Sequence, residues 1–408
     1  MAADPEIRSS IFTPEHEALR TSVRAFVERE LAPHAQAWEE AGDFPDWVFT
    51  KLGEQGYLGL AYPEEVGGQG GDYISTLVLK EEMARVGSGG VGMAVAVQTD
   101  MATPPILKFG TEAQKQEYLV PAIKGTKIAC LGISEPNAGS DVASIETSAV
   151  RDGSDWVING RKIFITNGCR AHFCTLVART DRGLIDDGAQ SQGGTASSIN
   201  PRKPAGHHGF SLFLVPTDTP GWQVARRLDK LGMHSSDTAE IVMDDMRLPA
   251  DALLGVQGEG FQQIMWELQG ERLVGVAGSI AGSRLLLERC SEYAKERTTF
   301  GKPIGKHQVI AHKLATMATE IEAAGALIYD AAWRFGNGEY PVKEISMAKL
   351  YGGIVAARVA NEAMQIFGGA SYMMELPIQR AWRDTRLIRI GGGTDEIMRE
   401  IISKLMGL

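Results

Sequence analysis

The sequence predicts a multidomain α+β protein, with an N-terminal α-helical domain over residues 1–127, a middle antiparallel β domain over 128–245 and a C-terminal four-helix bundle over 246–408. Three observations lead to this prediction. Apolar residues recur at helical spacing in the first third, turn dipeptides separate short apolar runs in the middle, and long helical runs follow. A chain of 408 residues is long enough for two or three domains of ordinary size.

The N-terminal domain is predicted from helix signals. Thr13 followed by Pro14 is typical of a helix start, because Thr can cap the helix and Pro suits its first position. Apolar residues then recur every three or four positions from Leu19 onward. Further helices are expected near residues 74–86 and 112–118.

The middle domain is predicted from β signals that begin near Ile128. The dipeptides Asp152-Gly153 and Asn159-Gly160 stand between apolar runs, which is the strongest short-range hairpin pattern. The stretch 182–208 contains mainly small and polar residues, so it is expected to form a long surface loop between two strands.

The C-terminal domain is predicted from helical runs after Gly260. These runs are interrupted near Gly301, Asn337, Gly368 and Gly391. Four or five long helices joined by short loops are typical of an antiparallel bundle.

Composition and motifs exclude several classes of function. With 41 Lys plus Arg against 51 Asp plus Glu, the net charge is −10, so nucleic-acid binding is not expected. The sequence shows no signal segment and no run of about 18 apolar residues, which predicts a cytoplasmic protein without a membrane span. The 4 Cys lack CxxC spacing, so no metal site is expected. A glycine-rich motif at Gly87 follows a helical run instead of a strand, which argues against a dinucleotide fingerprint.

Two segments of the middle domain carry candidate ligand-binding residues. Residues 134–141 (SEPNAGSD) follow a strand and can present N–H groups and Ser hydroxyls to a polar edge or a phosphate, although an ordinary turn explains the same residues. In KIFITNG, Phe164 and Thr166 lie two apart on a strand and therefore share a face. An aromatic wall beside a hydroxyl suits a planar heteroaromatic ligand; a strand packed on the core is the alternative.

Two segments of the C-terminal domain complete the candidate site. Glu271 and Arg272 precede a helical stretch that carries no charge up to Gly282, as a buried helix would. Burial raises the pKa of a carboxylate, which suits a general base, whereas a structural ion pair is the alternative. The run IGGGTDEI, residues 390–397, places three glycines before a helix that Thr394 could cap, where a ligand could approach the backbone closely.

Taken together, these four segments resemble the acyl-CoA dehydrogenase family, and the similarity extends from about Ile11 to Leu408. Further matching runs stand in the same order and spacing: LFLVPTDTPG, LDKLGMHSSDTAEIVMDD, ERTTFGKPIGKHQ, QIFGGASY and RDTRLIRIGGGTDEIMREII. The resemblance implies the three-domain fold predicted above, noncovalently bound FAD, and a homotetramer built as a dimer of dimers.

The resemblance also assigns cofactor and substrate residues. It implies that the flavin ring is bordered by Leu131, Ile133, Ser134, Ser140, Phe164 and Thr166, with Phe164 where many members have Trp. It implies that the FAD of a neighbouring subunit is held by Arg297, Phe300, Gln308, Gln365, Gly368 and Gly369. Thr394 and Glu396 match contacts to FAD phosphate and ribose. The thioester and its pantetheine arm would be met by Ser140, Gln269, Arg272 and Gly393.

The sequence departs from most of the family at the catalytic base. Most members carry the catalytic Glu one residue before a Gly-Thr pair in the C-terminal loop, and here that position is Gly392. A minority, which includes isovaleryl- and long-chain-type enzymes, carries it on the earlier helix immediately before an Arg, where Glu271 stands. The burial argument marks the same residue, so Glu271 is the predicted base. Gly392 keeps its backbone N–H, which in the family binds the thioester oxygen together with the ribityl 2′-OH of FAD.

The resemblance implies α,β-desaturation of an acyl-CoA thioester in fatty acid β-oxidation, with electrons passed to an electron-transferring flavoprotein. The moved base favours a medium-to-long or branched acyl chain, as do Gly89, Gly90 and Gly92, which would leave room in the acyl pocket. The open alternatives are an acyl-CoA oxidase, an enzyme for carrier-protein thioesters or nitroalkanes, and a non-catalytic binding homologue.

Overall fold

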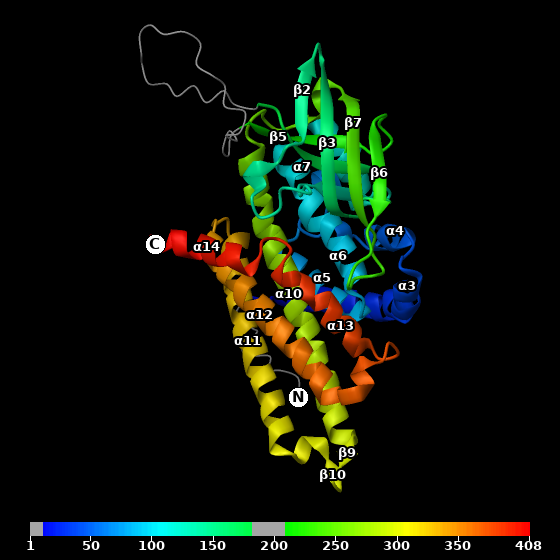
Figure 1. The fold of residues 1–408 in the computed structure, drawn as a ribbon, viewed down its shortest axis with the longest axis vertical. Helices are drawn as coiled ribbons and strands as arrows, with labels where there is room; N and C mark the ends of the chain where they lie inside the picture. Colours follow the sequence, from blue (N-terminus) through cyan, green and yellow to red (C-terminus); the bar gives the residue numbers. More distant parts are fainter. Residues whose placement is uncertain (1–10, 182–208) are drawn as a thin grey trace.

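Helices, a sheet and a helix bundle follow one another along the chain, which confirms the predicted fold class (Figure 1). The computed structural model describes residues 11–181 and 209–408, so the loop predicted over 182–208 lies outside the described residues. The sheet lies at one end of the molecule and the bundle at the other, with α10 (Gly260–Glu296) running from one to the other.

The N-terminal domain begins with the predicted capped helix. The Thr13 hydroxyl accepts the N–H of His16 at 3.4 Å, and the His16 ring accepts the N–H of Thr13 at 3.0 Å, which is a reciprocal capping box. From residue 11 onward, the α-helices of this domain are α2 (Pro14–Phe26), α3 (Ala35–Ala41), α4 (Trp47–Glu54), α5 (Tyr73–Met83), α6 (Gly89–Ala96), α7 (Pro104–Phe109), α8 (Glu112–Gln114) and α9 (Val120–Ile123). A π-helical segment, Val97–Ala102, continues α6.

The middle domain is a sheet whose described strands lie in the order β6-β7-β3-β2-β4-β5-β8, with β1 beside β4. Most neighbours are antiparallel, but β1 pairs with β4 in parallel, with Cys130 opposite Cys174, so the sheet is mixed. The β2–β3 hairpin stands between β1 and β4 in the chain, and β4 therefore re-enters beside β1 in the same direction. The strands are β1 (Ala129–Gly132), β2 (Ser148–Asp152), β3 (Asp155–Thr166), β4 (Phe173–Arg179), β5 (Phe210–Pro216), β6 (Trp222–Arg227), β7 (Thr238–Leu248) and β8 (Leu253–Leu254).

The hairpin predicted at Asn159-Gly160 is wrong. The strand β3 runs straight through these residues, and the chain reverses only after Asp152, where Gly153 has φ +63°. At Gly160 the pairing of β3 with β7 shifts register, and a Cβ there would come within 2.4 Å of the Thr147 hydroxyl oxygen. The glycine therefore allows a bulge and a close approach of two chain segments instead of a turn.

The C-terminal bundle contains three long helices and two shorter ones. They are α10, α11 (Gln308–Gly336), α12 (Val342–Phe367), α13 (Pro377–Thr385) and α14 (Asp395–Leu405). A two-stranded ribbon, β9 (Thr298–Thr299) and β10 (Lys302–Pro303), joins α10 to α11 at the end farthest from the sheet (Figure 1). One hydrophobic core unites α10, α11 and α12 with α5 of the N-terminal domain. No described helix is long and apolar enough to cross a membrane.

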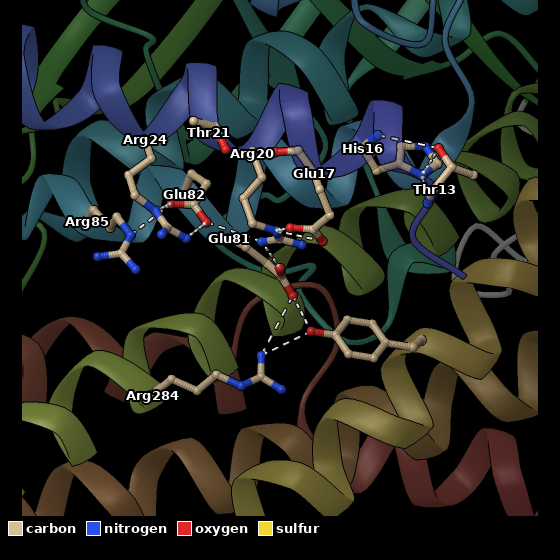
Figure 2. Close-up of polar contacts among 11 residues, drawn as sticks. Thr13, His16, Glu17, Arg20, Thr21, Arg24, Glu81, Glu82, Arg85 and Arg284 are labelled. Atoms are coloured by element: carbon tan, nitrogen blue, oxygen red, sulfur yellow. Dashed lines mark hydrogen bonds and ion pairs between the residues drawn. The ribbon is translucent and has the colours of Figure 1, made fainter. Parts of the chain in front are cut away.

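A buried ionic network joins the N-terminal helices to the bundle (Figure 2). Arg20 on α2 lies 2.5 Å from Glu81 and 3.2 Å from Glu82, both on α5, and all three side chains are buried. Glu81 also lies 3.7 Å from Arg284 on α10. The network therefore connects three helices of two domains through charges that water does not screen.

Candidate active site

The long helix α10 carries both residues of the predicted Glu-Arg pair. Burial raises the pKa of the Glu271 carboxyl, while the positive charges of Arg272 and Lys349 oppose that rise. A carboxyl held in this way combines a raised proton affinity with neighbouring cations that keep its ionised form accessible. The structure thus gives Glu271 the environment of a general base.

The triple-glycine loop, residues 391–393, lies directly beside this helix. Gly392 and Gly393 have φ of +65° and +103°, which L residues with side chains rarely adopt. A Cβ at Gly392 would stand 3.2 Å from Oε1 of Glu271. Position 392 and the Glu271 carboxyl therefore face each other, although 121 positions separate them in the chain. The following residue, Thr394, caps α14 as predicted, because its hydroxyl accepts the N–H of Ile397 at 3.3 Å.

Arg272 holds the glycine loop instead of extending away from the helix. Its Nε donates to the Gly392 carbonyl at 2.9 Å, and its Nη1 donates to Gln269 Oε1 at 3.4 Å. Gln269 in turn donates to the Met265 carbonyl at 2.8 Å on its own helix. Both side chains predicted beside the pantetheine arm are thus buried and hydrogen-bonded within the protein.

Two buried ionisable residues near Glu271 escaped the sequence-based prediction. Lys349 on α12 is 1% exposed, and its Nζ donates to the Gly393 carbonyl. Glu267, one helical turn before Glu271, is 2% exposed, and neither carboxyl oxygen has a hydrogen-bond partner among the described residues. Burial raises the pKa of Glu267 well above its ordinary value, which favours the neutral form of this carboxyl. A signal was available for Glu267, because it lies four residues before Glu271 and therefore shares its helix face.

The two predicted segments of the middle domain meet in the structure. The Ile163 N–H of β3 donates to the Ser134 carbonyl at 2.9 Å, so the loop 131–140 lies along the strand that carries Phe164 and Thr166. Phe164 is 69% exposed with φ +64°. The next residue, Ile165, is buried, and Thr166 after it is partly exposed.

A buried ion pair anchors this loop from beneath. Lys162 is fully buried and donates to Glu135 at 2.8 Å and to the Ile133 carbonyl at 3.0 Å. Glu135 also accepts the N–H groups of Glu146 and Thr147 at 2.7 and 3.0 Å. Burial alone would raise the pKa of Glu135, but Lys162 together with the N–H groups of Thr147 and Glu146 lowers it overall. Sequence reasoning did not assign this pair, which fixes the loop predicted to border the flavin.

The loop and α10 share one hydrophobic cluster. Leu131 and Ile133 pack against the same core as Ile264 and Leu268 of α10. The predicted flavin segment and the helix of Glu271 are therefore neighbours. The Thr166 hydroxyl makes no hydrogen bond within the described residues, and a Phe as exposed as Phe164 is unusual in a folded chain. A planar ring with polar edges, such as a flavin, fits this open aromatic and hydroxyl pair.

The residues predicted to hold the FAD of another subunit gather at the opposite end of the bundle, whereas Thr394 and Glu396 lie at the start of α14, beside the glycine loop. At about 1.5 Å per helical residue, Arg297 lies roughly 39 Å along α10 from Glu271. Phe300 is 95% exposed, and Gln308 and Arg297 are exposed as well. The rings of Tyr293 and Phe367 stack at 4.2 Å, which brings the ends of α10 and α12 together, so that Gln365, Gly368 and Gly369 lie near this group. The chain does not bring these residues to Glu271; their predicted role toward another subunit's FAD stays a prediction.

Two glycines expected to leave room for the acyl chain have another explanation. A Cβ at Gly89 would come within 2.9 Å of the Asp384 carboxylate, and one at Gly90 within 2.2 Å of the Ser235 hydroxyl. These glycines permit close packing of α6 against neighbouring segments, which corrects the expectation. Of the three glycines, Gly92 alone has open space, because a Cβ there would meet no atom within 4 Å.

The fold and the site together place the chain among flavin-dependent oxidoreductases. It matches three domain families in chain order: the acyl-CoA dehydrogenase N-terminal domain over residues 13–126, the middle domain over 130–246 and the C-terminal domain over 258–407. These matches span most of its length, so the chain belongs to the acyl-CoA dehydrogenase family. It is an enzyme of this family, whose members use FAD.

Similar proteins of known name extend over nearly the whole chain. The probable acyl-CoA dehydrogenase YngJ of Bacillus subtilis is 38% identical over 392 residues, which is 96% of this chain and 98% of YngJ. The mouse mitochondrial long-chain specific acyl-CoA dehydrogenase is 38% identical over 97% of this chain and 87% of its own. The bovine mitochondrial short-chain specific enzyme is 37% identical over 97% of this chain and 91% of its own.

Solved structures share the whole fold. That of a probable acyl-CoA dehydrogenase from Mycobacterium abscessus has a TM-score of 0.90 and 41% identity, covering 98% of this chain and 100% of the other. The structure of PigA with FAD and proline has a TM-score of 0.89 and 26% identity, covering 97% and 98%.

Proposed function

We propose that the chain is an acyl-CoA dehydrogenase in which Glu271 removes the α-proton of an acyl-CoA thioester to give the trans-2-enoyl-CoA. The observation that carries this proposal is the distance of 3.2 Å between Oε1 of Glu271 and the position that a Cβ at Gly392 would take. Because the two positions face each other, a carboxyl on α10 reaches the space that a side chain on the C-terminal loop would otherwise fill.

The carboxyl environment supports the base role. Burial raises the pKa of Glu271, which strengthens it as a proton acceptor, while Arg272 and Lys349 limit the rise. Since an α-proton beside a thioester is weakly acidic, the charge that develops on the thioester oxygen needs donors. The N–H groups of Gly392 and Gly393 make no hydrogen bond within the described residues, so they are available for that oxygen.

FAD, when bound, supplies the acceptor for the β-hydride at its N5 atom. The chain's own contribution is the segment around Ser134, Phe164 and Thr166, which would hold the flavin ring. The Lys162–Glu135 pair keeps that segment in place from beneath, at 2.8 Å.

A cavity beside α10 supports the proposal that the thioester arm binds along this helix. Its volume is about 750 Å³, and its lining includes Phe261, Met265, Trp266, Tyr340 and Lys108. The Tyr340 hydroxyl donates to the Met265 carbonyl at 3.1 Å, one turn before Gln269. A mainly apolar wall suits an extended amide-containing arm, and its two charged side chains, Lys108 and Glu339, leave the binding of the terminal phosphates to other residues.

The finer assignments follow from the position of the base. A carboxyl on α10 supports membership of the isovaleryl- and long-chain-type subgroup, and open space at Gly92 supports a medium-to-long or branched acyl chain. An electron-transferring flavoprotein would accept the electrons, and a homotetramer would bring the exposed residues around Phe300 to another subunit's FAD.

The test is anaerobic flavin bleaching, the loss of flavin absorbance on reduction, with a series of acyl-CoA thioesters from short to long and with branched members. Bleaching by one class of thioester, without hydrogen peroxide release in air, supports the dehydrogenase. Rapid peroxide release would indicate an oxidase, and bleaching only by carrier-protein thioesters or nitroalkanes would reassign the substrate. A colourless protein that binds no FAD would point to a non-catalytic homologue.

A further inference from the structure

We propose that Lys349 is a positioning residue for this reaction: together with Arg272 it holds the two carbonyls of the glycine loop, so that the loop's N–H groups remain set for the thioester oxygen. This inference rests on the proposed function, because it assigns the loop to the reacting thioester. It adds a residue on α12, whose other assigned residue, Gln365, lies near the opposite end of that helix.

The geometry is that of a clamp with two arms. Arg272, on α10, donates from Nε to the Gly392 carbonyl at 2.9 Å. Lys349, on α12, donates from Nζ to the next carbonyl, that of Gly393. Both side chains are buried, with exposures of 5% and 1%. Two cations from two helices therefore fix two consecutive peptide groups.

The loop needs such a clamp because it consists of three glycines. Glycine loses more backbone freedom on ordering than any other residue, so residues 391–393 would otherwise sample many conformations. Donors stabilise a developing oxyanion only when they are already oriented before the reaction. The Gly392 carbonyl shares its peptide plane with the Gly393 N–H, and the Gly393 carbonyl shares its plane with the Thr394 N–H, so the two cations fix both peptide planes that flank Gly393 and thereby orient the Gly393 N–H.

The charge of Lys349 acts on Glu271 as well. The groups that face Lys349 are Asp395 of α14, Glu271 and Arg272 of α10, and Arg389 of the turn before the loop. Burial, together with the two arginines, lowers the pKa of Lys349 to about 8, against the opposing effect of the two carboxylates. While Lys349 is charged, it lowers the pKa of Glu271.

The direction of the pH effect follows from these signs. As the pH rises through the pKa of Lys349, its ammonium loses a proton, and a charged hydrogen bond to Gly393 becomes a weaker neutral one. The weaker hold on the glycine loop slows proton abstraction, so the reaction should lose rate on the alkaline side.

The experiment measures the rate of anaerobic flavin bleaching as a function of pH in the holoenzyme, with the best thioester of the acyl-CoA series. The variants are Lys349→Met, Lys349→Arg and, as a control on the same helix, Lys343→Met. FAD absorbance and thermal unfolding of each variant report on folding separately from the rate.

We expect the wild type and Lys343→Met to lose rate above about pH 8, near the pKa of Lys349. Lys349→Met should bleach roughly 10- to 100-fold more slowly at neutral pH, up to the loss typical for removal of one oxyanion donor, and lack this alkaline decline. Lys349→Arg should keep most of the rate and also lack the decline, because guanidinium does not titrate there.

Wild-type rates and an unchanged alkaline decline in FAD-loaded Lys349→Met would overturn the proposal. If that variant does not retain FAD, the profile of Lys349→Arg decides: a decline like that of the wild type overturns the clamp. If no thioester bleaches the wild type, both the proposed function and the role of Lys349 are refuted. If the wild type bleaches and the Lys349 variants do not behave as expected, only the role of Lys349 is refuted.

Discussion

Replacing Gly392 with Ala tests the contact between the glycine loop and Glu271 by adding a single methyl group. At φ +65°, an L side chain costs the folded state about 1–2 kcal/mol. The new Cβ would lie 3.2 Å from Oε1 of Glu271, closer than an ordinary van der Waals contact, so the carboxyl has to move by a few tenths of an ångström.

The size of the rate effect follows from that displacement. A misplacement of about 1 Å can lower a rate roughly 10²-fold, so a few tenths of an ångström correspond to about four- to tenfold. Gly392→Ala should therefore bleach four- to tenfold more slowly with saturating acyl-CoA under anaerobic conditions, and it should unfold at lower denaturant concentration than the wild type.

Gly391→Ala provides the matched control in the same loop. A Cβ at Gly391 would meet only the Leu387 side chain and carbonyl, at 3.8 Å, and its φ is not positive. This variant should keep the wild-type rate and stability. If the two alanine variants bleach at the same rate, the reasoning that places position 392 against the Glu271 carboxyl is refuted.

Three further predictions concern stability and the base. Arg20→Met removes the buried cation that Glu81 and Glu82 share, although Glu81 keeps Arg284 and Glu82 keeps Arg24 and Arg85, and it should lower the free energy of unfolding by about 3 kcal/mol. Arg24→Met, which removes a side chain that is 41% exposed, should lower it by about 1 kcal/mol or less, and denaturant titration measures both. The pKa of Glu267 is raised by burial, so the unfolded chain releases its proton near pH 4.5 and the folded chain releases it only at a higher pH. Stability should thus fall as the pH rises above about 4.5, and Glu267→Gln should flatten that dependence; an unchanged slope between about pH 5 and 8 would contradict it. Gly392→Glu in a Glu271→Gly background should recover part of the bleaching rate, and no recovery with FAD bound would argue against a shared position for the two carboxyls.

Local signals in the sequence predicted local structure well. The caps at Thr13 and Thr394 depend on residues within three positions, and both form as expected. The order of domains follows from hydrophobic periodicity, which also acts over short distances. In contrast, the turn signal at Asn159-Gly160 is overridden by the pairing of β3 with β7, which no local pattern contains.

The candidate site was predictable only where its chemistry could be read from one segment. Glu271 stood out because an uncharged helix follows it and because its position matches a known subgroup. Lys349 and Glu267 did not, because a charge on a helix usually faces water, and only the packing of α10 and α12 shows that these two are buried. Gly89 and Gly90 were misread for the same reason, since a glycine looks alike in a pocket and in a tight packing contact.

The most direct test of the central claim is Glu271→Gln, which keeps the size of the side chain and removes its ability to accept a proton. Absorbance first establishes that the variant binds FAD, and anaerobic addition of the best acyl-CoA follows. The account predicts that the wild type bleaches and that FAD-loaded Glu271→Gln does not, with a rate lower by several orders of magnitude. Bleaching of the variant at near the wild-type rate would contradict the assignment of Glu271 as the base.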